Sequence, residues 1–98
     1  MENKLLPIGT VVSLKGAKKK LTIIGNSIKK DDGTIFEYIA VPHPEGFIDS
    51  DTMFLFNFED INSIDFIGFV NSEFQIFSQK FMQSKIDREK PADSTINM

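Results

Sequence analysis

The chain contains no cysteine and no tryptophan, and it has a single histidine among its 98 residues. Without cysteine, disulfide bonds, zinc ribbons, iron–sulfur clusters and thiolate catalysis are all excluded. Long apolar runs are missing as well. No window approaches the roughly 20 residues of a membrane helix, and the first residues include no apolar stretch of signal-peptide length. The sequence therefore predicts a protein that stays in the cytoplasm.

Basic residues are absent from one long stretch of the chain. Residues 31–75 carry ten acidic side chains and no lysine or arginine, whereas residues 1–30 carry seven lysines and one glutamate. We expect neighbouring strands and loops to bring the two signs together, as is usual for charges on solvated faces. An acidic face that attracts a basic partner is the alternative. The net charge of −3 and the pI near 5.0 argue against nucleic acid as the partner.

Size and composition predict one domain. A chain of 98 residues with 41% hydrophobic and 26% charged side chains is typical of a small soluble globular domain and not of a disordered one. We place the domain at residues 6–88. Residues 1–5 are expected to form a flexible N-terminus, and residues 89–98 a disordered tail.

Five short strands are expected before residue 70, because apolar residues alternate or cluster there between turn signals. The expected strands are 10–14, 20–25, 34–41, 52–56 and 64–69. The third should be central, since Glu37 alone interrupts its apolar character. Asp32-Gly33 predicts a hairpin before it, and two prolines and Gly46 end it. Asn57 is suited to cap one helical turn before the fifth strand.

The spacing of apolar residues changes to that of a helix after residue 71. Phe74, Phe77 and Phe81 recur on one face, which predicts an amphipathic helix that begins after a Ser72 cap and ends near Arg88. We expect the three phenylalanines to pack on the strands. The predicted fold class is mainly β with α: a five-stranded SH3-like barrel or β-roll with a C-terminal amphipathic α-helix. An open antiparallel sheet with the helix on one face is the alternative.

Residues suited to catalysis are few. The single histidine, His43, lies between two prolines, and no Gly-x-Ser-x-Gly motif provides a nucleophile for it, so a surface position in a loop is expected. Asp49-Ser50-Asp51 does not continue with the spacing of a calcium-binding loop, and no glycine-rich phosphate loop is present. We predict a protein that is not an enzyme and has no catalytic residue, metal or cofactor.

Phenylalanine is unusually abundant, with ten in the chain. Five short strands cannot enclose all of them, so some must meet the helix, solvent or a partner. We predict a protein-binding surface with an apolar centre and an acidic rim, the usual anatomy of an interface. Its residues would be Phe47, Phe54, Phe58, Asp60 and Phe69. Stacking on RNA is the alternative, and the acidic balance argues against it.

Six short motifs stand in a fixed order along the chain. They are Leu6-Pro-Ile-Gly-Thr-Val-Val12, Leu14-Lys-Gly16, Ile23-Ile-Gly25, Pro42-x-Pro-Glu-Gly46, Phe56-Asn-x-Glu-Asp-Ile61 and Phe66-x-Gly68. In order and spacing the chain resembles a small domain-of-unknown-function family of Gram-positive bacteria, which occurs beside type VII (ESX-like) secretion genes and their LXG-type toxins. The resemblance extends over roughly residues 5 to 85.

The resemblance implies a cytoplasmic accessory protein, a chaperone or targeting factor for a cognate LXG-type effector. The expected partner is that effector or its small helical accessory proteins, with neither nucleic acid nor a membrane as partner. It supplies no catalytic residue. Two other functions stay open: an immunity protein that neutralises a toxin domain, and an SH3-like nucleic-acid module. The second would use Lys15, Lys18, Lys19, Lys20, Lys29 and Lys30.

Overall fold

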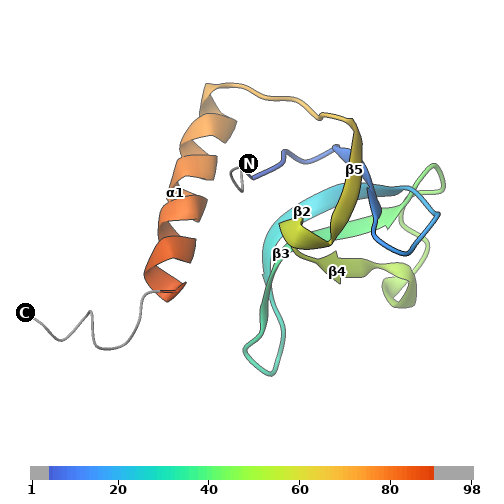
Figure 1. Ribbon diagram of the computed structural model, residues 1–98, viewed down its shortest axis with the longest axis horizontal. Helices are drawn as coiled ribbons and strands as arrows, with labels where there is room; N and C mark the ends of the chain where they lie inside the picture. Colours follow the sequence, from blue (N-terminus) through green and yellow to red (C-terminus); the bar gives the residue numbers. More distant parts are fainter. Residues whose placement is uncertain (1–4, 90–98) are drawn as a thin grey trace, which may run out of the picture.

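A computed structural model describes residues 5–89 of the chain, with side chains up to residue 84 (Figure 1). Five strands form one antiparallel sheet and a single helix follows them. The elements are β1 (Val11–Leu14), β2 (Leu21–Lys29), β3 (Ile35–Pro42), the 3₁₀ turn η1 (Ser50–Thr52), β4 (Phe54–Phe56), the 3₁₀ turn η2 (Phe58–Asp60), β5 (Ile61–Phe66) and α1 (Ser72–Glu89).

The sheet is open. Its strand order is β4-β3-β2-β1-β5, so β4 and β5 form the two edges. The predicted mainly β fold with a C-terminal helix is confirmed, but an SH3-like barrel is not, because the sheet does not close. The edge strands explain why: β4 has three residues, all paired with β3, and the pairing of β5 with β1 is interrupted by two register shifts. Such bulges bend an edge strand away from further pairing.

Three strands differ in extent from the expectation. β4 begins two residues later than predicted, at Phe54, because Ser50–Thr52 form η1. β2 continues past Gly25 to Lys29 through a shift in its register with β3. At this shift a Cβ on Gly25 would lie 2.7 Å from Cγ2 of Ile39, so glycine allows the two strands to approach. β5 begins and ends three residues earlier than predicted, at Ile61 and Phe66. The chain then leaves the sheet towards α1, and Figure 1 shows this connection crossing above the N-terminal segment.

The core lies between the sheet, the N-terminal segment and α1. Its buried side chains come from all three parts: Leu5, Leu6, Val12, Leu21, Ile23, Tyr38, Ala40, Phe56 and Phe81. Leu5 is 4% exposed although it was assigned to the flexible N-terminus. The rest of that segment, residues 1–4, and residues 90–98 of the predicted tail lie outside the described residues. The Tyr38 hydroxyl accepts a hydrogen bond from the Leu6 N–H at 3.1 Å, which ties the N-terminal segment to β3.

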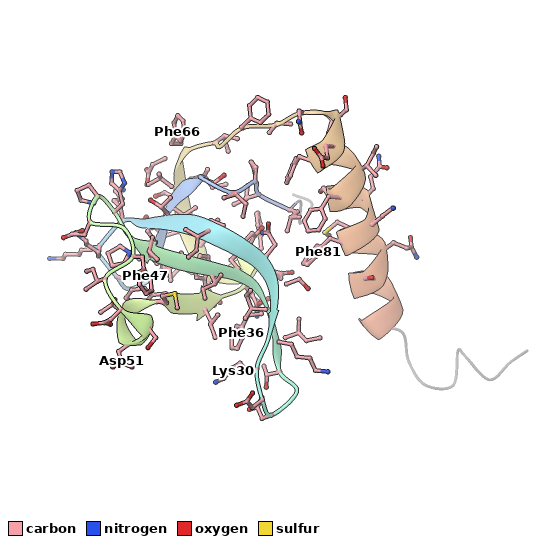
Figure 2. All side chains as sticks on the ribbon, turned by 180° about the vertical axis from the view of Figure 1, so that it is seen from behind. Lys30, Phe36, Phe47, Asp51, Phe66 and Phe81 are labelled. Carbon is pink, nitrogen blue, oxygen red and sulfur yellow. The ribbon has the colours of Figure 1, made fainter. Side chains whose placement is uncertain are left out.

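The helix contacts this core through a narrow line of side chains. Phe81 is buried, and Phe74 and Met82 are half-buried against the core. Phe77 is 47% exposed, so its predicted place in the core is wrong. Figure 2 shows Phe81 on the side of α1 that faces the sheet. Within residues 5–89, α1 is the one α-helix. It is not long and apolar enough to cross a bilayer.

The helix is capped by Asn71 rather than by Ser72. The Asn71 side-chain oxygen accepts a hydrogen bond from the Phe74 N–H at 2.9 Å, and its carbonyl accepts one from the Gln75 N–H at 3.0 Å. This is the N-cap arrangement, in which the cap satisfies one of the free N–H groups of the first turn. The predicted Ser72 cap is therefore wrong by one residue, and Ser72 is the first residue of the helix.

Candidate functional site

The structure places the five predicted partner-binding residues in three regions. Phe47 lies in the loop before η1, and Phe54 begins β4. Phe58 and Asp60 belong to η2. Phe69 lies in the connection between β5 and α1, beyond the opposite edge of the sheet from β4. The five residues therefore do not form one surface.

Phe47 and Phe54 flank η1 and are both exposed, at 65% and 41%. Between them, Ile48 is also exposed, and Asp49 and Asp51 add negative charge. We call these five residues the η1 surface. Figure 2 shows Phe47 and Asp51 at the end of the molecule far from α1. The surface thus combines exposed apolar side chains with two carboxylates.

Hydrogen bonds fix the backbone under the η1 surface. The Asp49 carboxylate accepts a bond from the Asp51 N–H at 3.0 Å, and the Asp49 N–H donates to the Thr52 hydroxyl at 3.3 Å, which completes a capping box. Just before the surface, the Gly46 N–H donates to the Pro42 carbonyl at 2.7 Å. The positive φ of Gly46, 81°, allows that turn. The exposed side chains therefore project from an ordered loop.

Phe58 and Asp60 both have partners within the fold. Phe58 is half-buried and packs against the core. The Asp60 carboxylate accepts a hydrogen bond from the Asn57 N–H at 2.9 Å, which closes η2. Asn57 occupies the predicted cap position, but its side-chain oxygen accepts a bond from the Glu37 N–H of β3 at 2.9 Å. Glu37 of β3 reaches the same turn, where its carboxylate accepts a bond from the Phe58 N–H at 2.6 Å. Asp60 thus helps to shape η2 while its side chain stays at the surface.

Phe69 belongs to a second apolar surface, which the sequence analysis did not identify as a unit. The connection from β5 to α1 exposes Phe66, Ile67, Phe69 and Val70, at 62%, 48%, 78% and 44%. Ile67 and Phe69 alternate as if they continued a strand, and that pattern concealed their exposure. This segment is held by Gly68, whose N–H donates to the buried Thr10 hydroxyl at 3.1 Å, and the sequence near residue 68 carries no signal of that contact.

Gly68 is packed tightly against the start of the domain. A Cβ at this position would overlap the carbonyl oxygen of Ile8 and lie 3.1 Å from the carbonyl carbon of Gly9. Only glycine allows the two backbone segments to approach this closely. Alongside this crossing, an open groove of about 430 Å³ is lined by Ile8, Phe69, Phe74 and Phe77, among others.

The lysines of the N-terminal half fall into two separate groups. Four lie in the turn between β1 and β2 and two near the turn between β2 and β3, so the nine-residue strand β2 separates the groups by roughly 30 Å if extended. Lys19 pairs with Glu45 at 2.8 Å and Lys20 with Asp65 at 2.9 Å. The hydrogen bond from Lys19 lowers the pKa of Glu45. The expected meeting of opposite charges is confirmed at these pairs, and the six lysines do not form a single basic patch.

His43 lies in an open cavity of about 530 Å³, whose lining includes Lys20, Thr22, Asp65 and Phe66. The His43 Nδ1 atom is 3.4 Å from the Thr22 hydroxyl oxygen. The carboxylate in this cavity, Asp65, pairs with Lys20 at 2.9 Å. In a hydrolytic triad it would have to orient the histidine ring beside a nucleophile. Among the side chains of residues 5–84, no three histidine or acidic groups gather in a way that could hold a metal ion.

Residues 5–77 match a protein family described as Domain of unknown function (DUF4176), and this range includes all five strands and the start of α1. No curated protein and no solved structure matches the chain.

Proposed function

We propose that the chain, which belongs to the family Domain of unknown function (DUF4176), is a non-enzymatic, cytoplasmic protein-binding accessory factor. In its specific form, the proposal is a chaperone or targeting factor that binds a cognate LXG-type protein before export by a type VII secretion system. This specific proposal is supported by the six sequence motifs, which resemble those of a family that occurs beside type VII secretion genes. The partner is the LXG-type protein or one of its small helical accessory proteins.

The η1 surface is the observation that carries the proposal. Phe47, Ile48 and Phe54 expose apolar area that the fold itself does not use. Because hydrogen bonds hold the loop around Asp49, a partner would not have to pay the full entropy of ordering it. Apolar anchors contribute most of the affinity of an interface, and the charges at its rim increase the association rate. The surface is therefore suited to a partner with apolar and basic residues.

The test is binding of the purified full-length chain to the LXG-type protein encoded beside it, measured by calorimetry. We expect Phe47→Ala or Phe54→Ala to raise the dissociation constant about 30-fold if that residue is an anchor. Phe66→Ala is the matched control, because Phe66 is as exposed as Phe47 but belongs to the far edge strand. If the melting temperatures of the variants are unchanged, the loss of affinity is due to the missing contact with the partner and not to unfolding. Equal losses in all three variants would contradict a role for the η1 surface.

Charge at the rim provides a second readout. Asp51→Lys should slow association and reduce its dependence on salt, while dissociation changes little. Asp51 suits this test because it is exposed and contributes its backbone N–H, not its carboxylate, to the capping box of η1. If the neighbouring LXG-type and accessory proteins all fail to bind at tens of micromolar, the targeting-factor proposal is wrong.

An immunity protein is the second candidate, and the acidic character of the η1 surface favours it. Asp49 and Asp51 would suit a basic toxin domain such as a nuclease. The two candidates differ in what binds. If only the C-terminal toxin domain binds and its activity is blocked, the immunity function replaces the targeting function. Binding to the N-terminal part of the LXG-type protein supports targeting.

A further inference from the structure

A flank of α1 next to the core remains open to solvent. Phe77 is 47% exposed there and lines the apolar groove with Ile8 and Phe69, which are 50% and 78% exposed. At 3.6 residues per turn, the half-buried Phe74 and the buried Phe81 lie about 40–60° to one side of Phe77 around the helix axis. The groove is therefore an extension of the core that the fold leaves uncovered.

Two charged residues lie on the other side of Phe77. Glu73 and Lys80 are placed about 40–60° from it around the helix axis, on the side opposite to Phe74 and Phe81, and Glu73 also lines the groove. Both side chains are exposed, and neither forms an ion pair with another side chain of residues 5–84. They are seven residues apart in one helix, or roughly 10 Å along its axis, which is too far for them to pair with each other.

The positions of Glu73, Phe77 and Lys80 are complementary to the same three positions in a second copy of α1. A two-fold axis near Phe77 would place a second helix antiparallel to the first, with one Phe77 against the other. Glu73 lies about 6 Å before Phe77 along the axis, and Lys80 about 4.5 Å after it. In the antiparallel pair, Glu73 of each copy therefore lies level with Lys80 of the other, on the same side of the contact. A parallel pair would instead place the charged residues of the two copies on opposite sides of the contact, where Glu73 and Lys80 could not pair.

We propose that a second copy of this chain covers the groove, through an antiparallel pairing of α1 with α1 about Phe77. Glu73 of each copy pairs with Lys80 of the other, and Phe69 and Ile8 of both copies cover the ends of the contact. Such an interface is isologous, as in most homodimers. The surface differs from the η1 surface, so the dimer leaves Phe47 and Phe54 free for the proposed protein partner.

The test is sedimentation equilibrium of the full-length chain alone over a range of concentrations. We expect a mass that rises from that of one chain, 11.1 kDa, towards twice this value. Phe77→Ala should weaken the association by removing the central contact. Lys80→Glu should weaken it at least about tenfold, because it replaces two attractive pairs with two repulsive ones. Glu73→Lys should weaken the association to a similar extent. Circular dichroism of each variant should show that the helix is still formed.

The double variant Glu73→Lys/Lys80→Glu is the decisive measurement, because it restores opposite charges across the interface. We expect its dissociation constant to return close to that of the unaltered chain. Glu59→Lys, a reversal of the same size in η2, is the control and should change nothing. A chain that stays monomeric at hundreds of micromolar overturns the proposal, as does a double variant that associates no better than Lys80→Glu.

The result is independent of the proposed function, since this assay contains no other protein. If the chain is monomeric and Phe77→Ala instead weakens binding of an LXG-type protein, the groove belongs to that partner and the dimer is wrong. If the chain dimerises but no LXG-type protein binds, the dimer proposal is supported and the proposed targeting function is wrong.

Discussion

The carboxylate of Glu37 accepts a hydrogen bond from the backbone N–H of Phe58 at 2.6 Å, although the two residues are 21 positions apart. A second bond runs in the opposite direction between β3 and η2: the Glu37 N–H donates to the side-chain oxygen of Asn57, the residue before Phe58, at 2.9 Å. Glu37 is only 6% exposed. A side chain of the interior strand β3 thus satisfies an N–H group of η2 that the turn itself leaves free. This pair of bonds positions η2 and therefore the path of the chain into β5.

Loss of the Glu37 carboxylate should destabilise the domain. In Glu37→Ala the Phe58 N–H loses a partner in a partly buried site, which costs about 1–3 kcal/mol of unfolding free energy. Glu37→Gln should cost less, because its amide oxygen can still accept the bond. Urea denaturation followed by circular dichroism measures both. Equal losses for Ala and Gln would show that the hydrogen bond to Phe58 is not what matters.

Tyr38 should make the domain sensitive to alkaline pH. Burial of its phenol raises the pKa from 10.0 to about 12. A raised pKa means that the folded state holds the proton more tightly, so this contribution to stability is complete below pH 10 and is lost as the pH rises to about 12. Tyr38→Phe removes that dependence. At neutral pH it should cost about 1–3 kcal/mol, because the Leu6 N–H loses its acceptor.

The measurement is the free energy of unfolding from pH 8 upwards for both proteins. Lysines titrate in the same range, so only the difference between the unaltered chain and Tyr38→Phe reports on the phenol. We expect that difference to shrink as the pH rises. A constant difference would contradict the raised pKa.

The two candidate caps of α1 can be separated by substitution. Asn71→Ala should cost about 1 kcal/mol, because the Phe74 N–H loses its acceptor. Ser72→Ala should change stability little, since Ser72 is already inside the helix. Thermal unfolding and the helical signal in circular dichroism provide the comparison. A larger loss for Ser72→Ala than for Asn71→Ala would place the cap at the serine.

The phenylalanines of α1 should differ sharply in their effect on stability. Phe81 is 7% exposed, so Phe81→Ala should cost about 3–5 kcal/mol or detach the helix. Phe77 is half exposed, and Phe77→Ala should cost below about 1 kcal/mol. Both are measured at low protein concentration, where self-association does not contribute. Similar losses for the two variants would mean that Phe77 is packed in solution.

The sequence was sufficient wherever one local signal dominated. Asp32-Gly33 predicted the turn between β2 and β3, where Gly33 has a φ of 92° and the Asp32 side chain accepts a bond from the Thr34 N–H at 2.9 Å. The hydrogen bonds from Thr34 also lower the pKa of Asp32. The recurrence of Phe74, Phe77 and Phe81 likewise predicted the helix, although Phe77 does not join the other two in the core. Each of these features depends on residues close together in the chain.

Predictions were wrong where distant residues decide the structure. The end of β5 depends on the contact of Gly68 with Ile8, and no spacing near residue 68 shows that contact. The cap of α1 was misplaced because Asn71 and Ser72 are both suited to it locally. The candidate site was selected by residue type, which identified the exposed Phe47, Phe54 and Phe69. It could not show that the open sheet places Phe69 apart from the other two.

Because α1 contacts the core through a narrow line of side chains, the helix can separate from the sheet by local unfolding. The strands are joined by ladders of backbone hydrogen bonds, whereas α1 reaches the core through Phe74, Phe81 and Met82 alone among its described side chains. Its release exposes few apolar groups and breaks no ladder. We therefore expect the helix and the sheet to open as two cooperative units with different local free energies. In native-state hydrogen exchange, the amides of α1 should lose their protection before those of β2 and β3.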